Sequence, residues 1–221
     1  MSDTQIPFEH EKALPFSLSV KKHYKVPDDN CIHIGDELDC YFGGRWPKDP
    51  DGRFSATGEL AESKRRLLEW YKAFPVMMVC ISNHGLRWVK KASAAEIPSQ
   101  LMRSYTEIIE APSGWVWKEE WNIPTKNPFR AIHGMGYSGQ NGHRLAAIDA
   151  GISTCIGHLH SHAGISYVRT QNQRIFGFNV GCLIDSQQYA FSYGKESRFK
   201  PCLGVGIIAG SGSTPIWIPL E

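Results

Sequence analysis

The chain has 221 residues, of which 42% are hydrophobic and 21% are charged, and its formal net charge at pH 7 is +2. This length and hydrophobic content suffice for one domain with a substantial core, so we predict a single domain over residues 1–221. The charge balance excludes the strongly basic class of nucleic-acid-binding proteins, but it neither requires nor excludes a nucleic-acid partner.

The cysteines and the first residues indicate the cellular compartment. No Cys-x-x-Cys pair occurs among the six cysteines, so we expect buried, reduced thiols rather than disulfides. The first five residues are polar and no apolar core follows them, which predicts no signal peptide. The longest apolar run, residues 76–81, is too short to span a bilayer. These features predict a cytoplasmic protein without a membrane partner.

The first half of the chain alternates helical and strand patterns. Residues 9–24 predict a helix that Pro15 interrupts, and a turn at 27–30 leads to a short strand at 31–34. Residues 43–56 predict a polar loop in which Arg45, Trp46 and Lys48 are exposed. Residues 57–74 carry an apolar stripe typical of a helix, and residues 76–81 predict a strand buried on both faces.

The second half ends in a β-rich tail. Residues 94–110 predict another helix, residues 115–121 an aromatic strand-and-turn cluster, and residues 129–132 a short strand. A helix at 140–150 and a strand at 152–156 follow. Four β-rich runs then occupy residues 174–180, 189–193, 203–208 and 216–218. Strands alternating with helices before a β-rich tail predict a layered α/β or α+β domain.

Four predicted strands end in polar residues that suit a divalent cation. In chain order these residues are Asp36 and Asp39, Asn83 and His84, His133, and finally His158 and His160. Sites in α/β sheets gather beyond the carboxyl ends of strands, so we expect these side chains to lie together. Mixed oxygen and imidazole donors favour Mn, Fe, Mg or Zn over metals that select thiolates. Taken singly, each residue has an ordinary structural role, such as a helix cap for Asp36.

The same residues resemble the calcineurin-like metallophosphoesterases, particularly phage and bacterial members. The family pattern is Asp-x-His, Gly-Asp-x-x-Asp, Gly-Asn-His-Asp/Glu, a lone His and Gly-His-x-His. The matching segments are Asp3-Thr4-Gln5, Gly35-Asp36-Glu37-Leu38-Asp39, Ser82-Asn83-His84-Gly85, His133 before Gly134, and Gly157-His158-Leu159-His160. The resemblance implies a four-layer α/β/β/α sandwich of two mixed β-sheets flanked by helices. For a phage-encoded protein, the compartment would be the bacterial host cytoplasm.

The resemblance also implies a dinuclear metal centre that hydrolyses phosphate esters through a metal-activated hydroxide. Manganese is the expected metal, with Mg, Fe, Zn or Ni as alternatives. Asp36 would bridge the two cations and take part in catalysis, and His84 would protonate the leaving oxygen. The remaining ligands would be Asp3, Gln5 and His160 at the first cation and Asn83, His133 and His158 at the second. Such cations sit about 3.5–4 Å apart.

Basic residues near the expected site indicate the substrate. Arg45, Arg87 and His162 are candidate substrate-binding residues, and the loop around Arg45 would suit stacking on a base and pairing with phosphate. We therefore expect a phosphodiesterase that acts on nucleotides or nucleic acid. The alternatives are a phosphomonoesterase, a protein phosphatase, or a scaffold protein that keeps the fold with weakened chemistry. The oligomeric state stays open, with a dimer as one option.

Three departures from the family pattern qualify these expectations. Gln5 replaces a histidine, and an amide oxygen is the weaker donor, so the first cation site is expected to be weaker and to favour Mn or Mg. Gly85 replaces an acidic residue, which removes a supporting carboxylate. The first strand of the fold is missing or truncated before Asp3, so either Asp3 is poorly anchored or the natural chain begins further upstream.

Overall fold

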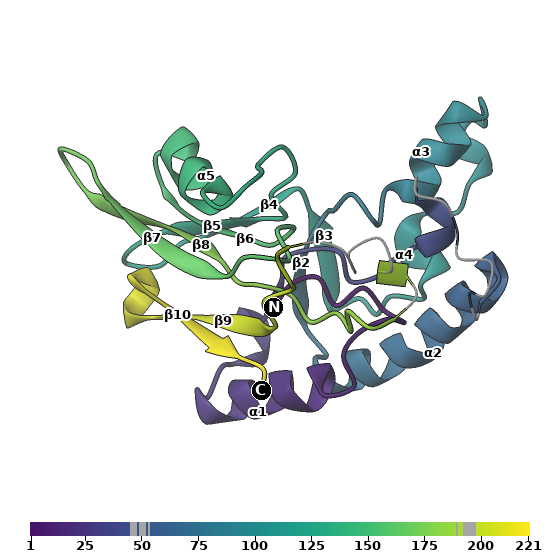
Figure 1. The fold of residues 1–221 in the computed structure, drawn as a ribbon, viewed down its shortest axis with the longest axis horizontal. Helices are drawn as coiled ribbons and strands as arrows, with labels where there is room; N and C mark the ends of the chain where they lie inside the picture. Colours follow the sequence, from purple (N-terminus) through teal and green to yellow (C-terminus); the bar gives the residue numbers. More distant parts are fainter. Residues whose placement is uncertain (45–47, 49–51, 53, 189, 192–197) are drawn as a thin grey trace.

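Helices α1 and α2 cover one β-sheet and helix α5 covers the other, so the chain forms four layers (Figure 1). This architecture is seen in a computed structural model, which describes residues 1–221 except 45–47, 49–51, 53, 189 and 192–197. Arg45, one of the predicted substrate-binding residues, lies outside the described residues, as does much of the predicted run at 189–193. The mixed α/β sandwich predicted from the sequence is confirmed.

Two long amphipathic helices form the outer layer on one side. α1 (Ala13–His23) begins four residues later than predicted, and Pro15 lies in its first turn, where backbone N–H groups have no helical partner. α2 (Ala56–Ala73) begins where the Ser55 hydroxyl accepts a hydrogen bond from Gly58 N at 3.1 Å. α2 buries Leu67 and Trp70 against the sheet, as the apolar stripe predicted.

The smaller sheet is wholly parallel. It has the order β1-β2-β3, with β1 at Ile32–His33, β2 at Met77–Cys80 and β3 at Trp115–Lys118. The first residues of the chain follow β1 in parallel: Ile34 N donates to Met1 O at 2.8 Å and Asp3 N donates to Gly35 O at 3.0 Å. Residues 1–5 do not form a regular strand, yet these bonds fix Asp3 firmly. Poor anchoring of Asp3, one of the two alternatives drawn from the sequence, is therefore wrong.

The larger sheet is mixed and has the order β4-β5-β6-β8-β7. The strands are β4 (Glu120–Ile123), β5 (Phe129–Ile132), β6 (Ser153–Ile156), β7 (Gly164–Arg169) and β8 (Arg174–Asn179). β5, β6 and β8 run parallel, while the edge strands β4 and β7 are antiparallel to their neighbours. α5 (Gly142–Ala150) covers this sheet, and β9 (Gly204–Ala209) and β10 (Thr214–Pro219) form a separate hairpin.

The core between the two sheets is apolar and contains reduced cysteines. Cys80 and Cys155 pack there with Phe129 and Phe178, and all four side chains are buried. All six cysteines are free thiols, and five of them are buried, as predicted. None of the helices in the described part of the chain combines the length and the apolar character needed to cross a bilayer.

The single helix predicted over residues 94–110 is wrong. The chain instead forms α3 (Arg87–Ala94), a 3₁₀ turn at Ser99–Leu101 and the short α4 (Tyr105–Ile108). Glu96 takes a left-handed conformation with φ of 58°, and Pro98 lacks an N–H group and disfavours helical geometry at the residue before it. Ser104 then starts α4 with a capping box. These local features therefore prevent one continuous helix over this segment.

Candidate metal centre

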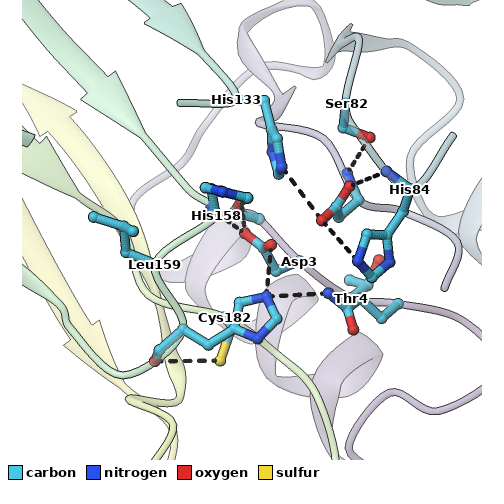
Figure 2. Close-up of polar contacts among 12 residues, drawn as sticks. Asp3, Thr4, Ser82, His84, His133, His158, Leu159 and Cys182 are labelled. Atoms are coloured by element: carbon cyan, nitrogen blue, oxygen red, sulfur yellow. Dashed lines mark hydrogen bonds and ion pairs between the residues drawn. The ribbon is translucent and has the colours of Figure 1, made fainter. Parts of the chain in front are cut away.

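The loops that follow β1, β2, β5 and β6 meet the first residues of the chain at one place. Figure 2 shows the side chains of Asp3, His84, His133 and His158 directed toward one another. The backbone here is unusual, since Asp3, Gln5, Asp36 and His158 all have positive φ angles between 48° and 68°. Non-glycine residues in this conformation cluster at functional sites, where the surrounding structure holds them in place.

Asp36 lies at the middle of the cluster and is 1% exposed. Its backbone N–H donates to the Ser82 hydroxyl at 2.8 Å, and its Oδ1 accepts from His84 N at 3.1 Å. Its Oδ2 lies 3.3 Å from His133 Nε2 and 3.6 Å from His84 Nε2. Burial alone would raise the pKa of Asp36, but the charges of His133 and His84 outweigh it and hold the pKa well below its usual range. Asp36 is therefore an ionised carboxylate.

One half of the cluster is built by strand ends around His133. The His133 Nδ1–H donates to Ile34 O at 2.8 Å, which turns Nε2 toward Asn83 Oδ1, at 2.9 Å, and toward Asp36. A backbone carbonyl that fixes the second ring nitrogen is a common support of metal-binding histidines. Burial would lower the pKa of His133, but Asp36 outweighs it and raises the pKa to about 9. Donor atoms of Asp36, His133 and His158 all lie within 4.8 Å of one another.

The other half is built by the N-terminal segment and the loop after β6. Asp3 Oδ1 lies 2.9 Å from His160 Nε2, and Asp3 Oδ2 accepts from His158 N at 2.9 Å. Burial would lower the pKa of His160, but the Asp3 charge outweighs it and raises that pKa. Donor atoms of Asp3, Asp36 and His160 lie within 4.8 Å of one another. Asp36 thus belongs to both groups of potential ligands.

Glycine at position 157 allows these two segments to approach. A Cβ atom there would lie 1.8 Å from Ser2 Oγ and 2.5 Å from Asp3 Oδ2, closer than any real contact. The Ser2 hydroxyl itself hydrogen-bonds the Asp3 carboxylate. Gly157 therefore determines how close Asp3 lies to the two histidines that follow it in the chain.

The contacts around Gln5 test whether the donor set fits a cation. His160 Nε2 faces Asp3 Oδ1 and also lies 3.0 Å from Gln5 Nε2. If the ring N–H of His160 donates to Asp3, this N–H and the Gln5 amide NH₂ group are two donors that face each other. Gln5 Oε1 is buried and has no hydrogen-bond partner among the described residues. A cation that accepts electron pairs from Asp3, His160 and the Gln5 amide oxygen would remove both defects. The residues present therefore fit a hard divalent ion.

His84 lies between the cluster and a basic residue. Its Nδ1 is 3.2 Å from Asp39 Oδ1, and Arg87 Nη2 contacts its Nε2. Arg87 Nη1 donates to Asp39 O at 2.6 Å, which holds the guanidinium beside the histidine. A histidine flanked by a carboxylate and a guanidinium can exchange a proton with a ligand in this site.

Sequence reasoning missed the support provided by Glu37. Its Oε1 accepts hydrogen bonds from Tyr105 OH at 2.7 Å and from Trp117 Nε1 at 2.9 Å, which joins the loop after β1 to α4 and β3. The Tyr105 ring lies 3.5 Å from the position of a Cβ at Gly85, so it fills the space beside that glycine. The signal in the sequence was the place of Glu37 within the Gly-Asp-x-x-Asp segment, but its partners come from distant elements.

The cluster opens into a cleft of about 1360 Å³ that is lined in part by Asp36, Asn83, His84, His158 and His160. The structure brings the seven predicted metal ligands together at this point. It also places Arg87 in the cleft wall, whereas His162 is not among the described residues that line the cleft. His162 instead contacts the Ser161 hydroxyl at 2.9 Å and the Phe199 ring.

No protein-family model matches the chain, and no curated protein matches it significantly. Membership in the metallophosphoesterase family therefore stays a prediction from the residues described above.

Proposed function

We propose that this protein is a two-metal phosphoesterase, most specifically a phosphodiesterase that hydrolyses nucleotides or nucleic acid. The observation that supports it is the position of the ionised Asp36 carboxylate, which is shared by two groups of potential ligands. Two divalent cations held in this way would bind a phosphate group and lower the pKa of an attacking water. Water would add to phosphorus, the P–O ester bond would break, and the leaving oxygen would take up a proton.

The residues around the cluster have distinct roles in this proposal. The Ser82 hydroxyl holds the backbone N–H of Asp36, and His84 N holds its carboxylate. Ile34 O orients the His133 ring. Arg87 Nη2 contacts His84 Nε2, and His84 Nδ1 faces Asp39. A substrate phosphate that attracts Arg87 would free Nε2 to carry the proton that the leaving oxygen needs.

Manganese-dependent hydrolysis of bis-p-nitrophenyl phosphate by chelator-treated protein tests the proposal. We expect activity to return on addition of Mn²⁺, with two metal ions bound for each chain by elemental analysis. The H84Q variant should keep both ions and lose about 10²–10⁴-fold in kcat, the usual contribution of a general acid.

H23Q, at an exposed position on α1, is the matched control and should behave as the original chain. Stoichiometric metal binding without hydrolysis of mono- or diesters would instead favour a scaffold protein, for which Gln5 and Gly85 are the supporting observations. Absence of both metal binding and metal-dependent hydrolysis would contradict the phosphoesterase and would also favour the scaffold protein.

A further inference from the structure

One face of α3 is cationic and lines the cleft. Arg87, Lys90, Lys91 and Ala94 all contribute to the cleft wall, and their spacing of three, four and seven residues places them on the same side of the helix. α3 contains no acidic residue, and the side chains of Lys90 and Lys91 are exposed. The helix therefore presents a row of positive charge that begins beside His84 and continues away from the metal ligands.

An exposed aromatic side chain lines the same cleft. Phe199 keeps 48% of its surface exposed, although a phenylalanine gains most by burial. The Arg198 guanidinium lies 5.5 Å from the Phe199 ring centroid, and Lys200 also lines the cleft. An aromatic ring among cations is the arrangement on which nucleic-acid bases stack while the backbone is neutralised.

The size of the cleft favours an extended ligand. Its volume of about 1360 Å³ exceeds the roughly 300–1,000 Å³ of ordinary small-molecule pockets. The potential metal ligands occupy only part of the lining, whereas Lys90, Lys91 and Phe199 serve no step of phosphate-ester cleavage. In the cleft they can contact groups of the ligand other than the reacting phosphate.

Building on the two-metal phosphodiesterase proposed above, we infer that the substrate is single-stranded nucleic acid of several nucleotides. Phosphates that neighbour the cleaved one would bind along Lys90 and Lys91, and a base would stack on Phe199. A duplex presents no free base face to an aromatic ring, and a phosphomonoester has no neighbouring phosphate. The basic face and the aromatic ring are thus both explained by an unpaired strand.

Binding of fluorescein-labelled 12-nucleotide oligo-dT and oligo-U, measured by anisotropy in EDTA, tests the inference without activity. In single strands each phosphate contact contributes about 0.7 to the slope of log affinity against log salt concentration. The K90Q/K91Q variant should therefore lose about 1.4 from this slope, which is roughly 25-fold in affinity at 0.1 M salt.

F199A should weaken binding about tenfold, within the range for loss of one stacked base. K22Q/K126Q, which removes two exposed lysines that do not line the cleft, is the matched control and should retain the original slope. Equal slopes for K90Q/K91Q and the original chain, or a labelled duplex that binds as tightly as the single strand, would overturn the inference.

Kinetics separate this inference from the proposed function. If bis-p-nitrophenyl phosphate is hydrolysed, K90Q/K91Q should reduce the ratio of kcat/KM for the oligonucleotide to that for the small diester by at least tenfold. An unchanged ratio would overturn the strand-binding role and leave the phosphodiesterase intact. Salt-sensitive strand binding that depends on Lys90 and Lys91, without hydrolysis of any substrate, would support the strand-binding role and overturn the proposed function.

Discussion

The two halves of the candidate metal centre are built in different ways. Around His133, the donors follow regular strands, and each is fixed by a hydrogen bond to a buried partner such as Ile34 O. Around Asp3, the donors come from a segment without regular strand structure and from the loop after β6. The first arrangement depends on sheet hydrogen bonds, whereas the second depends on the close approach of Ser2 and Asp3 to Gly157.

This difference has consequences for metal binding. The strand-borne half has a preset His133 ring and offers a carboxylate, an amide and this imidazole as donors, and His158 from the loop after β6 adds a second imidazole. The N-terminal half has an amide at position 5 where an imidazole would be the stronger donor, and its positive-φ residues Asp3 and Gln5 are held by tertiary contacts. We therefore expect two cation sites of unequal affinity that share Asp36.

Replacing the shared ligand should have the largest effect, because it affects both halves at once. In D36N the amide has no negative charge and cannot neutralise two cations, so both should bind more weakly. Since each cation contributes several kcal/mol to catalysis, kcat/KM for bis-p-nitrophenyl phosphate should fall about 10³-fold or more.

D28N, which removes the exposed carboxylate paired with Lys21, is the control and should change kcat/KM by less than twofold. Loss of only one cation in D36N would show that the two halves do not share this residue.

A methyl group at position 157 should damage the N-terminal half most. G157A places a Cβ against Ser2 and Asp3, and overpacking of this kind costs about 1–3 kcal/mol of unfolding free energy. Urea unfolding of the metal-free variant measures this cost, and elemental analysis should find that one of the two manganese ions is lost.

The control is G164A, because a Cβ there meets nothing within 4 Å, and its unfolding free energy should stay within about 1 kcal/mol of the original. G157A with both ions retained at full affinity would contradict the role assigned to this close approach.

The pH dependence of stability tests how the N-terminal segment is held against β1. His33 is 1% exposed and its Nε2–H donates to Thr4 Oγ1 at 3.0 Å; burial, aided by the chain's amino group, lowers the pKa of His33 to about 3. Below pH 6.5 the unfolded chain takes up a proton on His33 and the folded chain does not. The contribution of the uncharged His33 to the free energy of unfolding is therefore complete above pH 6.5. It is lost as the pH falls toward 3.

Between pH 6.5 and pH 5 the loss from His33 is about 1.6 kcal/mol of unfolding free energy. The H33Q variant should lack this part of the pH slope when urea unfolding is measured at both values. The exposed His23, replaced in H23Q, provides the control. Identical slopes for H33Q and the original chain would mean that His33 is protonated in the folded protein.

Placing an imidazole at position 5 should produce the smallest of these effects and make the metal affinities of the two halves more alike. In Q5H the first cation gains a nitrogen donor, so its dissociation constant for Zn²⁺ should fall about tenfold, or ~1.4 kcal/mol. Calorimetric titration would show the two sites become more alike. Q171H, which adds an imidazole at an exposed position that does not line the cleft, should leave both affinities unchanged.

The sequence predicted that the strand-borne side chains come together, because alternation of strands and helices brings the ends of parallel strands to one edge. Asp36, Asn83 and His133 follow short apolar runs, and the structure places all three at that edge. The approach of the first residues to Gly157 could not be predicted, since it depends on the side-by-side placement of segments about 155 residues apart in the chain.

The error over residues 94–110 has a different origin. The predicted helix included Pro98, but a proline inside a helix loses a hydrogen bond and clashes with the preceding turn. The same error concealed the basic face of α3 from sequence analysis. The predicted helix began at residue 94, so only Arg87 of that face had been connected with the site. The lining role of Lys90 and Lys91 follows from where the helix begins, which the sequence pattern did not reveal.

The most direct measurement of the shared-ligand arrangement is anomalous diffraction from crystals soaked in manganese. Two peaks about 3.5–4 Å apart should flank the Asp36 carboxylate, one next to Asp3 and His160 and the other next to His133 and His158. The peak on the Asp3 side should have the lower occupancy at limiting metal. A single peak that touches only one group, or peaks remote from Asp36, would contradict a dinuclear centre in this protein.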